Sequence, residues 1–183
     1  MLKIGIVTTS IRKGRAGLGV AQWVLDNAIK KGDKDVRYEL IDLKDYQLPF
    51  MGQTPTDEQT AAINKWSEKI NEMDGYIFVM AEYNHSLTGV FKNATDFLQK
   101  EFHHKAAAYV GYGGVGGARA IEAHRLIAAE MHLATSRKTV NFLLAVDFEN
   151  YSVFKPLPHQ AGALNVLLDD LLPWVKAFKG LRQ

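Results

Sequence analysis

Short apolar segments alternate with amphipathic stretches along the whole chain, and this alternation restricts the fold more than any other feature of the sequence. The apolar segments are rich in Val, Ile, Tyr or Phe, which is typical of strands. Several are continuously apolar, as expected for a parallel sheet that helices cover on both faces. The five predicted strands are Lys3–Val7, Val36–Leu43, Tyr76–Ala81, Ala106–Gly111 and Thr139–Val146.

The intervals between strands carry apolar residues at helical spacing, so that one face of each helix can pack on the sheet. A strand–helix repeat of this kind requires right-handed crossovers and a doubly wound sheet. With five strands the flavodoxin-like order 2-1-3-4-5 is the natural arrangement, which predicts an α/β three-layer sandwich. We expect Pro173 to kink or restart the last helix, because proline removes a backbone donor. The helical stripes are Leu18–Ala28, Ala62–Met73, Leu87–Leu98, Ala120–Met131 and Leu164–Phe178.

Composition places the chain among single globular domains. It has 183 residues, of which 47% are hydrophobic and 23% charged, so we expect one domain spanning residues 1–183. The net charge of +2 is too small to favour nucleic acid or a membrane surface as a partner. The absence of cysteine excludes disulfides, thiolate metal centres and a cysteine nucleophile. Because we see no signal-peptide pattern and no apolar run near the ~20 residues of a membrane span, we expect a cytoplasmic protein.

In an open parallel sheet, ligands bind beyond the carboxyl ends of the strands, so the loops after the first, third and fourth strands form the candidate site. The first loop, 8–17, contains three hydroxyl and three cationic residues before a helix. Hydroxyl and backbone donors at a helix N-terminus favour an anion, whereas cations there oppose the helix dipole, so the loop predicts a bound phosphate. The alternative is a solvated loop with Ser10 as N-cap. The candidate residues are Thr9, Ser10, Arg12, Lys13 and Arg15.

The second loop follows the third strand and combines amide, hydroxyl and aromatic side chains. Such groups are suited to flank a flat heterocycle with hydrogen-bonding edges, although the spacing does not identify the ligand. Alternatively, Ser86 or Thr88 caps the next helix and Tyr83 packs on the sheet. A lone histidine such as His85 is more often a surface residue than a base. The candidate residues are Glu82, Tyr83, Asn84, His85 and Ser86.

The third loop, 111–117, has five glycines in seven residues. Close backbone approach or unusual dihedral angles justify so many. The segment matches the dinucleotide-binding pattern G-x-G-x-x-G, but that fingerprint belongs on the first strand with an acidic residue about 20 positions later. Here the next predicted strand ends near Asp147, so we expect backbone amides that edge a planar ligand instead. The candidate residues are Gly113, Gly114, Val115, Gly116 and Gly117.

Together, the basic hydroxyl loop, the segment Glu82–Asn93 and the glycine-rich loop resemble the NADPH-dependent FMN reductase family, flavodoxin-like oxidoreductases that include quinone, azo-dye and chromate reductases. The resemblance covers nearly the whole chain. It implies that the first loop holds the FMN phosphate, the second supports the isoalloxazine ring and the third surrounds its pyrimidine edge. The chain departs from the family pattern at Thr9, Ala81 and 15–17. By matching position, Ser10, Arg12 and Arg15 contact phosphate, Tyr83 and Asn84 line the ring, and Gly114 and Gly117 offer backbone donors.

The resemblance also implies an enzyme that passes hydride from NADPH to bound FMN and on to a quinone, an azo compound, a metal oxyanion or free flavin, by a ping-pong mechanism. The flavin carries the chemistry, so no catalytic side chain is expected. The surplus cations of the first loop favour NADPH, with NADH as a second donor. The alternative is a flavodoxin-type electron carrier or flavin-binding regulator without turnover, in which Tyr83 or Tyr112 shields the flavin.

Other classes fit less well. The chain lacks both the acidic residues of a phosphoreceiver domain and the Gly-x-Ser-x-Gly elbow of a serine hydrolase. The six histidines lack zinc-ligand spacing, so we predict no metal site and expect them to be solvated or capping. We also interpret Asp147 and Glu149 as solvated charges. Because Phe91, Phe97 and Phe102 exceed what one sheet-facing stripe needs, we expect a homodimer or homotetramer.

Overall fold

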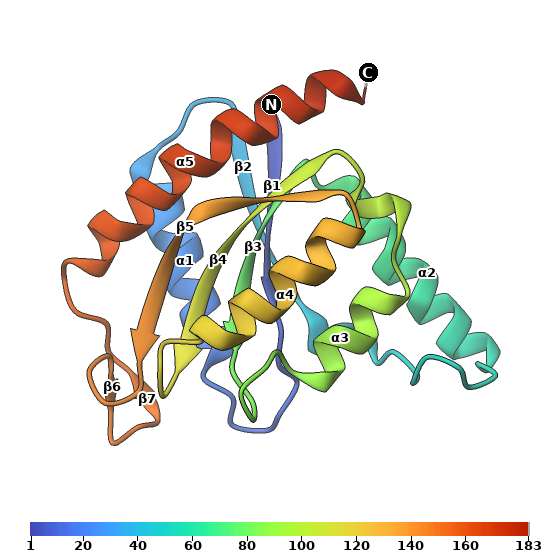
Figure 1. Cartoon of the computed structure of the whole chain (residues 1–183), viewed down its shortest axis with the longest axis horizontal. Coiled ribbons are helices and arrows are strands. Elements are labelled where there is room, and N and C mark those ends of the chain that lie inside the picture. The colour runs from blue at the N-terminus through green and yellow to red at the C-terminus, as the bar shows by residue number, and fades with distance from the viewer. Residues whose placement is uncertain (183) are drawn as a thin grey trace.

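Five parallel strands form the central sheet in the computed structural model, which describes residues 1–182 (Figure 1). The strand order is β2-β1-β3-β4-β5, as the sequence predicts. Ile4 of β1, for example, pairs with Tyr38 of β2 and Gly75 of β3. The carboxyl ends of all five strands therefore lie at the same edge of the sheet. The strands are β1 (Leu2–Thr8), β2 (Val36–Asp42), β3 (Gly75–Ala81), β4 (Lys105–Gly113) and β5 (Leu133–Leu143).

Helices cover both faces of this sheet: α1 and α5 pack on one face, and α2, α3 and α4 pack on the other (Figure 1). Hydroxyl caps set the start of two of them, since Thr56 Oγ1 accepts from Gln59 N and Thr88 Oγ1 accepts from Phe91 N, both at 3.2 Å. The predicted three-layer sandwich is confirmed. The helices are α1 (Gly17–Lys31), α2 (Asp57–Glu72), α3 (Gly89–Asp96), α4 (Ala118–Glu130) and α5 (Gln160–Leu181), with the short 3-10 helices η1 (Leu43–Tyr46) and η2 (Lys100–Phe102).

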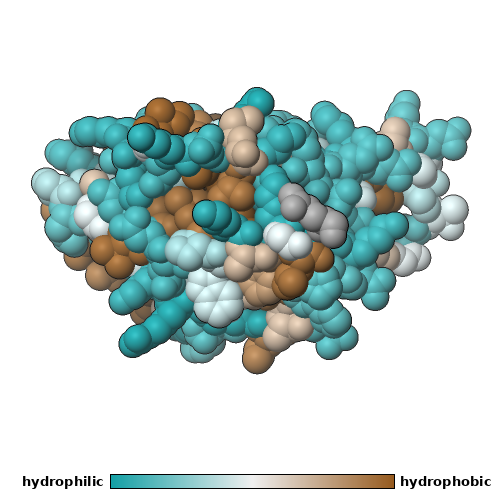
Figure 2. All heavy atoms as spheres, turned by 90° about the horizontal axis from the view of Figure 1, so that it is seen from above, coloured by the Kyte–Doolittle hydropathy of each residue, from teal (hydrophilic) through white to brown (hydrophobic). Residues whose placement is uncertain are grey.

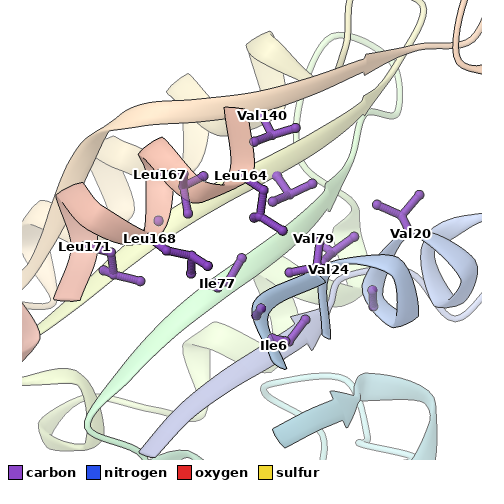
Figure 3. Packing of buried hydrophobic residues seen from close by; sticks show 14 of the residues in the cluster. Ile6, Val20, Val24, Ile77, Val79, Val140, Leu164, Leu167, Leu168 and Leu171 are labelled. Atoms are coloured by element: carbon purple, nitrogen blue, oxygen red, sulfur yellow. The ribbon is translucent and has the colours of Figure 1, made fainter. Parts of the chain in front are cut away.

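Two apolar cores, one on each face of the sheet, hold the layers together. On the first face, leucines of α5 and valines of α1 pack around Ile6, Ile77 and Val79 of the inner strands (Figure 3). On the second face, Trp66 of α2 and Phe91 of α3 are buried against aromatic residues of β3 and β4. Fully burying one such large apolar side chain contributes about 1.5–3 kcal/mol. β3 and β4 are buried along their whole length, as their continuous apolar runs predict.

The three phenylalanines that favour an oligomer in the sequence face the interior of the chain. Phe91 and Phe102 are buried in the second core, and Phe97 is partly buried against it. Phe102 packs edge to face on Tyr76, with ring centroids 5.2 Å apart. These residues therefore give no support to an oligomer, which stays a prediction.

The fifth strand is displaced from its predicted position. It spans Leu133–Leu143 instead of Thr139–Val146, whereas the bounds of the other four strands lie within two residues of the prediction. The segment that the prediction omits is polar, because β5 is an edge strand whose residues are largely exposed or half-buried there. At its other end, Val146 N donates to Leu143 O at 3.0 Å, and this turn takes the chain out of the sheet.

The last helix, α5, continues through Pro173 as one element, so the predicted restart does not occur. Pro173 lies on the exposed side of the helix, where water can bond the carbonyl that loses its amide partner. Leu171 and Val175, on either side of the proline in sequence, are both fully buried. Burial of this stripe against the sheet keeps the helix intact.

The N-terminus and the last turns of α5 lie at the end of the molecule opposite the carboxyl ends of the strands (Figure 1). Figure 2 views this end, and hydrophilic residues predominate on it. The carboxylate of Asp74 joins the segments there, since it accepts from Lys179 Nζ and Arg182 Nη2, both at 2.7 Å, and from Lys3 N at 2.9 Å. This network fixes the end of α5 to the sheet.

Candidate functional site

A cavity of about 500 Å³ lies at the carboxyl ends of the strands. Its walls come from the loops after β1, β3 and β4, which the sequence singles out, and from the segment after β5. The three predicted loops therefore converge on one cleft. The lining residues are Arg12, Gly14, Arg15, Ala16, Glu82, Tyr83, Asn84, Tyr112, Gly113, Leu144, Tyr151 and Ser152.

The loop between β1 and α1 brings the open N-terminus of a helix to the cavity. α1 begins after Ala16, and no side chain caps its first turn. The interpretation of Ser10 as N-cap is therefore wrong, and its hydroxyl oxygen lies 2.7 Å from Tyr83 Oη instead. Arg12 is exposed and lines the cavity near this helix start. The unpaired amides, the helix dipole and the guanidinium all favour an anion here.

Arg15 lies in the cavity wall and forms an ion pair with Asp42, at the end of β2. The pair is largely buried, with 8% of the Arg15 side chain and 12% of the Asp42 side chain exposed. Asp42 also accepts from Thr8 Oγ1 at 2.8 Å. Because the carboxylate neutralises this guanidinium, Arg12 carries the net positive charge of the wall. Asp42 is not among the residues predicted for the site, although its place at a strand end is a usable signal.

Thr9 fixes the first loop to the third strand. Its hydroxyl donates to Val79 O at 2.8 Å and accepts from Ala81 N at 3.1 Å. The hydroxyl of Thr88, which caps α3, donates to the carbonyl of Thr9. Both hydroxyls are thus used inside the protein, and Thr9 positions the loop without lining the cavity.

The loop after β3 contains a tight turn at 83–86. Tyr83 and Ser86 exchange two backbone hydrogen bonds, at 3.0 and 3.1 Å. Between them, Asn84 and His85 have φ of +46° and +72°, as in a type I′ turn. Residues other than glycine adopt this conformation at a cost, and such strain is common at functional sites. The turn brings Tyr83 and Asn84 to the cavity, while Thr88 and not Ser86 caps the next helix.

Glu82 joins the second loop to the start of α4. Its carboxylate accepts from Arg119 Nε at 2.6 Å and from Arg119 N at 3.1 Å, and its side chain is 4% exposed. Arg119 Nη1 also donates to His85 Nδ1 at 3.1 Å. Glu82 and His85 therefore hold a cation that the sequence analysis missed. The available signal was an arginine in the first turn of a helix, where it opposes the dipole unless a carboxylate accompanies it.

The glycine-rich loop folds back on its own strand. A Cβ on Gly111 would lie 2.3 Å from Gly116 O, and a Cβ on Gly117 would lie 2.7 Å from Tyr112 N. Gly117 also has φ of +73°. This is the close backbone approach that the glycines predict, but its partner is the protein itself. Gly113 brings the loop to the cavity.

Tyr112 lines the cavity between β4 and α1. The start of α1 approaches the ring so closely that a Cβ on Gly17 would lie 2.7 Å from Tyr112 Oη. Burial raises the pKa of Tyr112 above its usual value. The phenol therefore stays protonated and offers a neutral hydroxyl to the cavity.

The segment after β5 forms a further wall of the cavity, which was not predicted from the sequence. Two short strands, β6 (Phe148–Glu149) and β7 (Val153–Phe154), pair as an antiparallel hairpin. The turn of the hairpin brings Tyr151 and Ser152 to the cavity, and Leu144 joins them from the end of β5. Polar residues at 149–152 indicate a loop in the sequence, but not its return to the site.

Two residues that we expected in solvent are buried. Asp147 accepts from Leu143 N at 2.8 Å, which satisfies its carboxylate inside the protein. His124 of α4 stacks on Phe91, with ring centroids 5.0 Å apart, and its Nδ1 lies 2.8 Å from Tyr109 Oη. Burial lowers the pKa of His124 to about 3, so its imidazole is neutral. Both residues support the fold.

Within residues 1–182, no three side chains of His, Cys, Asp or Glu are grouped so that they could hold a metal ion. No described helix is long and apolar enough to cross a bilayer.

The predicted site residues divide into those that line the cavity and those that do not. The lining members are Arg12, Arg15, Glu82, Tyr83, Asn84 and Gly113. The other predicted residues, which do not line it, are Thr9, Ser10, Lys13, His85, Ser86, Gly114, Val115, Gly116 and Gly117.

The strand order and the place of the cavity define a flavodoxin-like protein with its site at the carboxyl edge of the sheet. Residues 2–146 match the family model described as NADPH-dependent FMN reductase, and the chain belongs to this family.

Curated relatives carry corresponding names. An NAD(P)H-dependent FMN reductase of Nectria sp is 34% identical over 128 residues, which are 66% of this chain and 64% of that protein. One of Schizosaccharomyces pombe is 36% identical over 124 residues, 63% of this chain and 60% of that protein. The match thus spans less than two thirds of the length of these two relatives. An NADPH azoreductase of Bacillus sp. (strain OY1-2) is 28% identical over 187 aligned positions, covering 100% of this chain and 97% of that protein.

Solved structures share the fold. FerB, a flavoenzyme NAD(P)H:(acceptor) oxidoreductase of Paracoccus denitrificans, superposes with a TM-score of 0.70 at 20% identity, covering 97% of this chain and 99% of that one. RosB with a bound riboflavin-5′-phosphate derivative gives a TM-score of 0.71 at 12% identity, covering 98% and 81%.

Proposed function

We propose that the chain binds FMN in this cavity and uses NAD(P)H to reduce a small acceptor such as a quinone, an azo compound, a metal oxyanion or free flavin. The convergence of three loops on one cavity carries the proposal, because an open helix start with Arg12 and two tyrosines share its wall. Membership of the FMN reductase family and the name of the Bacillus relative support the same chemistry.

The residues present fit FMN. The volume of about 500 Å³ is within the range of small-molecule sites. The first turn of α1 and Arg12 suit the phosphate, and Tyr83, Asn84 and Tyr112 supply ring surface and polar edges for the isoalloxazine. Arg15, which also lines the cavity, leaves its buried Nε without a partner in the described structure.

When bound, FMN supplies the redox chemistry, taking two electrons from NAD(P)H and passing them to the acceptor. The chain itself binds the cofactor and orients it. Arg12 and the amides of α1 would hold the phosphate, while the turn at 83–86 would place Tyr83 and Asn84 beside the ring. The neutral hydroxyl of Tyr112 is a fixed dipole that can stabilise negative charge without transferring a proton.

We favour a reductase over a flavodoxin-type carrier or regulator. A carrier shields the flavin with loop aromatics. Tyr83 is tied to Ser10 and Tyr112 packs against Gly17, so neither of the two tyrosines that the sequence offers for this role is free to close over the flavin. We propose a ping-pong order, because one cavity then takes NAD(P)H and the acceptor in turn.

Initial-rate kinetics with NADPH and 1,4-benzoquinone test the function. The proposal predicts sustained NADPH oxidation and parallel double-reciprocal lines. Reduction of bound FMN without further turnover would instead support the carrier, and intersecting lines would contradict the ping-pong order.

We also propose a preference for NADPH, because Lys13 is exposed on the first loop next to Arg12 and can meet the additional phosphate of this donor. NADH is the second donor, and equal kcat/KM for the two would contradict this preference. A cytoplasmic location and a homodimer or homotetramer stay predictions. A light-scattering mass equal to that of one chain would contradict the oligomer.

A further inference from the structure

The β6–β7 hairpin is a wall of the cavity that lies beyond the family match, which ends at residue 146. Ser152 N donates to Glu149 O at 3.2 Å and closes the turn at its tip. The two central residues, Asn150 and Tyr151, have φ of +51° and +57°. Turns of this kind prefer glycine at the second central position, since a side chain is strained there. A tyrosine in that place is an outlier that calls for a reason.

The base of the hairpin is rigid. Phe148 and Phe154 face each other across the two strands, with ring centroids 5.2 Å apart. Phe154 also packs edge to face on Phe142 at 4.8 Å and on Trp23 at 6.2 Å. The buried Asp147 accepts a backbone hydrogen bond just before β6. The turn is therefore held in a fixed position beside the cavity.

Packing of Tyr151 does not compensate its strain, because its side chain is 71% exposed. Of the three tyrosines that line the cavity, Tyr112 is 8% exposed and Tyr83 is 37% exposed. Tyr151 is thus the ring nearest to solvent. Because Tyr151 lines the cavity and remains exposed, its ring is available to a ligand that enters after the inner part of the cavity is filled.

We propose that Tyr151 determines specificity for planar aromatic electron acceptors, such as quinones and azo arenes, by packing its ring against theirs. This inference rests on the proposed function and deepens it. Aromatic pairs gain from offset or edge-to-face packing beyond simple burial, whereas a compact inorganic oxidant offers no such face. Tyr151 would therefore favour aromatic acceptors without contributing to FMN binding.

The test compares three variants of the FMN-loaded protein. Tyr151→Gly removes the ring and suits the turn, Tyr151→Phe keeps the ring, and Val153→Ala changes an exposed hairpin residue that does not line the cavity. Anthraquinone-2-sulfonate is titrated without any reductant, and the change in flavin absorbance gives its Kd. We expect Tyr151→Gly to weaken binding about three- to tenfold, and the other two variants to stay within about twofold of the wild type.

Three controls accompany this titration. For Tyr151→Gly, the Kd for FMN should be unchanged, kcat/KM with ferricyanide should be unchanged, and Tm should equal or exceed that of the wild type. Unaltered anthraquinone binding would overturn the proposal, and so would a weakened FMN affinity, which would assign the ring to the cofactor. A Tm of Tyr151→Gly below that of the wild type would contradict the backbone strain at Tyr151. Failure of the wild type itself to bind FMN would overturn the proposed function first, and this inference with it.

Discussion

The carboxylate of Asp42 neutralises the guanidinium of Arg15 inside the wall of the cavity. This pair ties the loop after β1 to the end of β2, and Thr8 Oγ1 supports it by donating to Asp42. The main role of Arg15 is therefore to fix the loop to β2. Its Nε has no hydrogen-bond partner in the described structure. Arg12 is left as the exposed cation of the wall.

Asp42→Asn should destabilise the protein by about 3–5 kcal/mol, because it leaves the Arg15 charge buried without its partner. Urea denaturation followed by circular dichroism measures this change. Glu149→Gln is the matched control, since its pair with Lys155 is exposed and should contribute less than about 1 kcal/mol. An equal loss of stability in the two variants would contradict the stabilising role of the Asp42–Arg15 ion pair.

Arg12→Ala should weaken FMN binding about 10- to 100-fold while leaving riboflavin binding nearly unchanged, because a charge-assisted phosphate contact is lost. Quenching of flavin fluorescence measures both affinities. Lys13→Ala, which changes a neighbouring cation that does not line the cavity, should have a smaller effect. An equal loss of riboflavin affinity in Arg12→Ala would place the guanidinium away from the phosphate.

Gly117→Ala should destabilise the protein by at least about 2 kcal/mol, since φ of +73° and a contact of 2.7 Å with Tyr112 N both oppose a Cβ. Gly114→Ala is the control in the same loop, because no atom lies within 4 Å of its added Cβ. Thermal unfolding should show a lower Tm for Gly117→Ala than for Gly114→Ala. A similar Tm for both variants would show that the loop adjusts without cost.

Stability should fall in mild acid because of His124. Burial lowers its folded-state pKa to about 3, whereas the unfolded chain binds a proton below about 6.5. Protonation therefore favours unfolding as the pH drops below 6.5. Between pH 7 and pH 5 it lowers the free energy of unfolding by about 2 kcal/mol. His124→Gln should remove this part of the pH dependence of the free energy of unfolding. An unchanged pH profile would contradict the assignment.

The sequence predicts the sheet and the place of the site because both depend on local patterns. The apolar runs of β3 and β4 are continuous, which predicts that both faces of these strands are buried. The ends of β1, β3 and β4 then determine which loops meet. The polar start of β5 hides its strand character, because an edge strand needs no apolar face on its open side.

Contacts between distant segments could not be predicted in the same way. Glu82 and Arg119 are 37 residues apart, and no spacing rule joins a loop residue to the first turn of a later helix. The hairpin with Tyr151 returns to the cavity because Phe148 and Phe154 pack on the core, which depends on three-dimensional packing. The contact of the glycine-rich loop with the backbone of its own strand was not predicted either, and its predicted contact with a ligand stays a prediction.

A crystal structure of the FMN-saturated protein tests the central claim most directly. We predict one flavin per chain, with its phosphate at the first turn of α1 beside Arg12 and its ring beside Tyr83 and Tyr112. Flavin density in the separate groove of about 300 Å³ near Ile11 and Val90, or no flavin density at all, would contradict it.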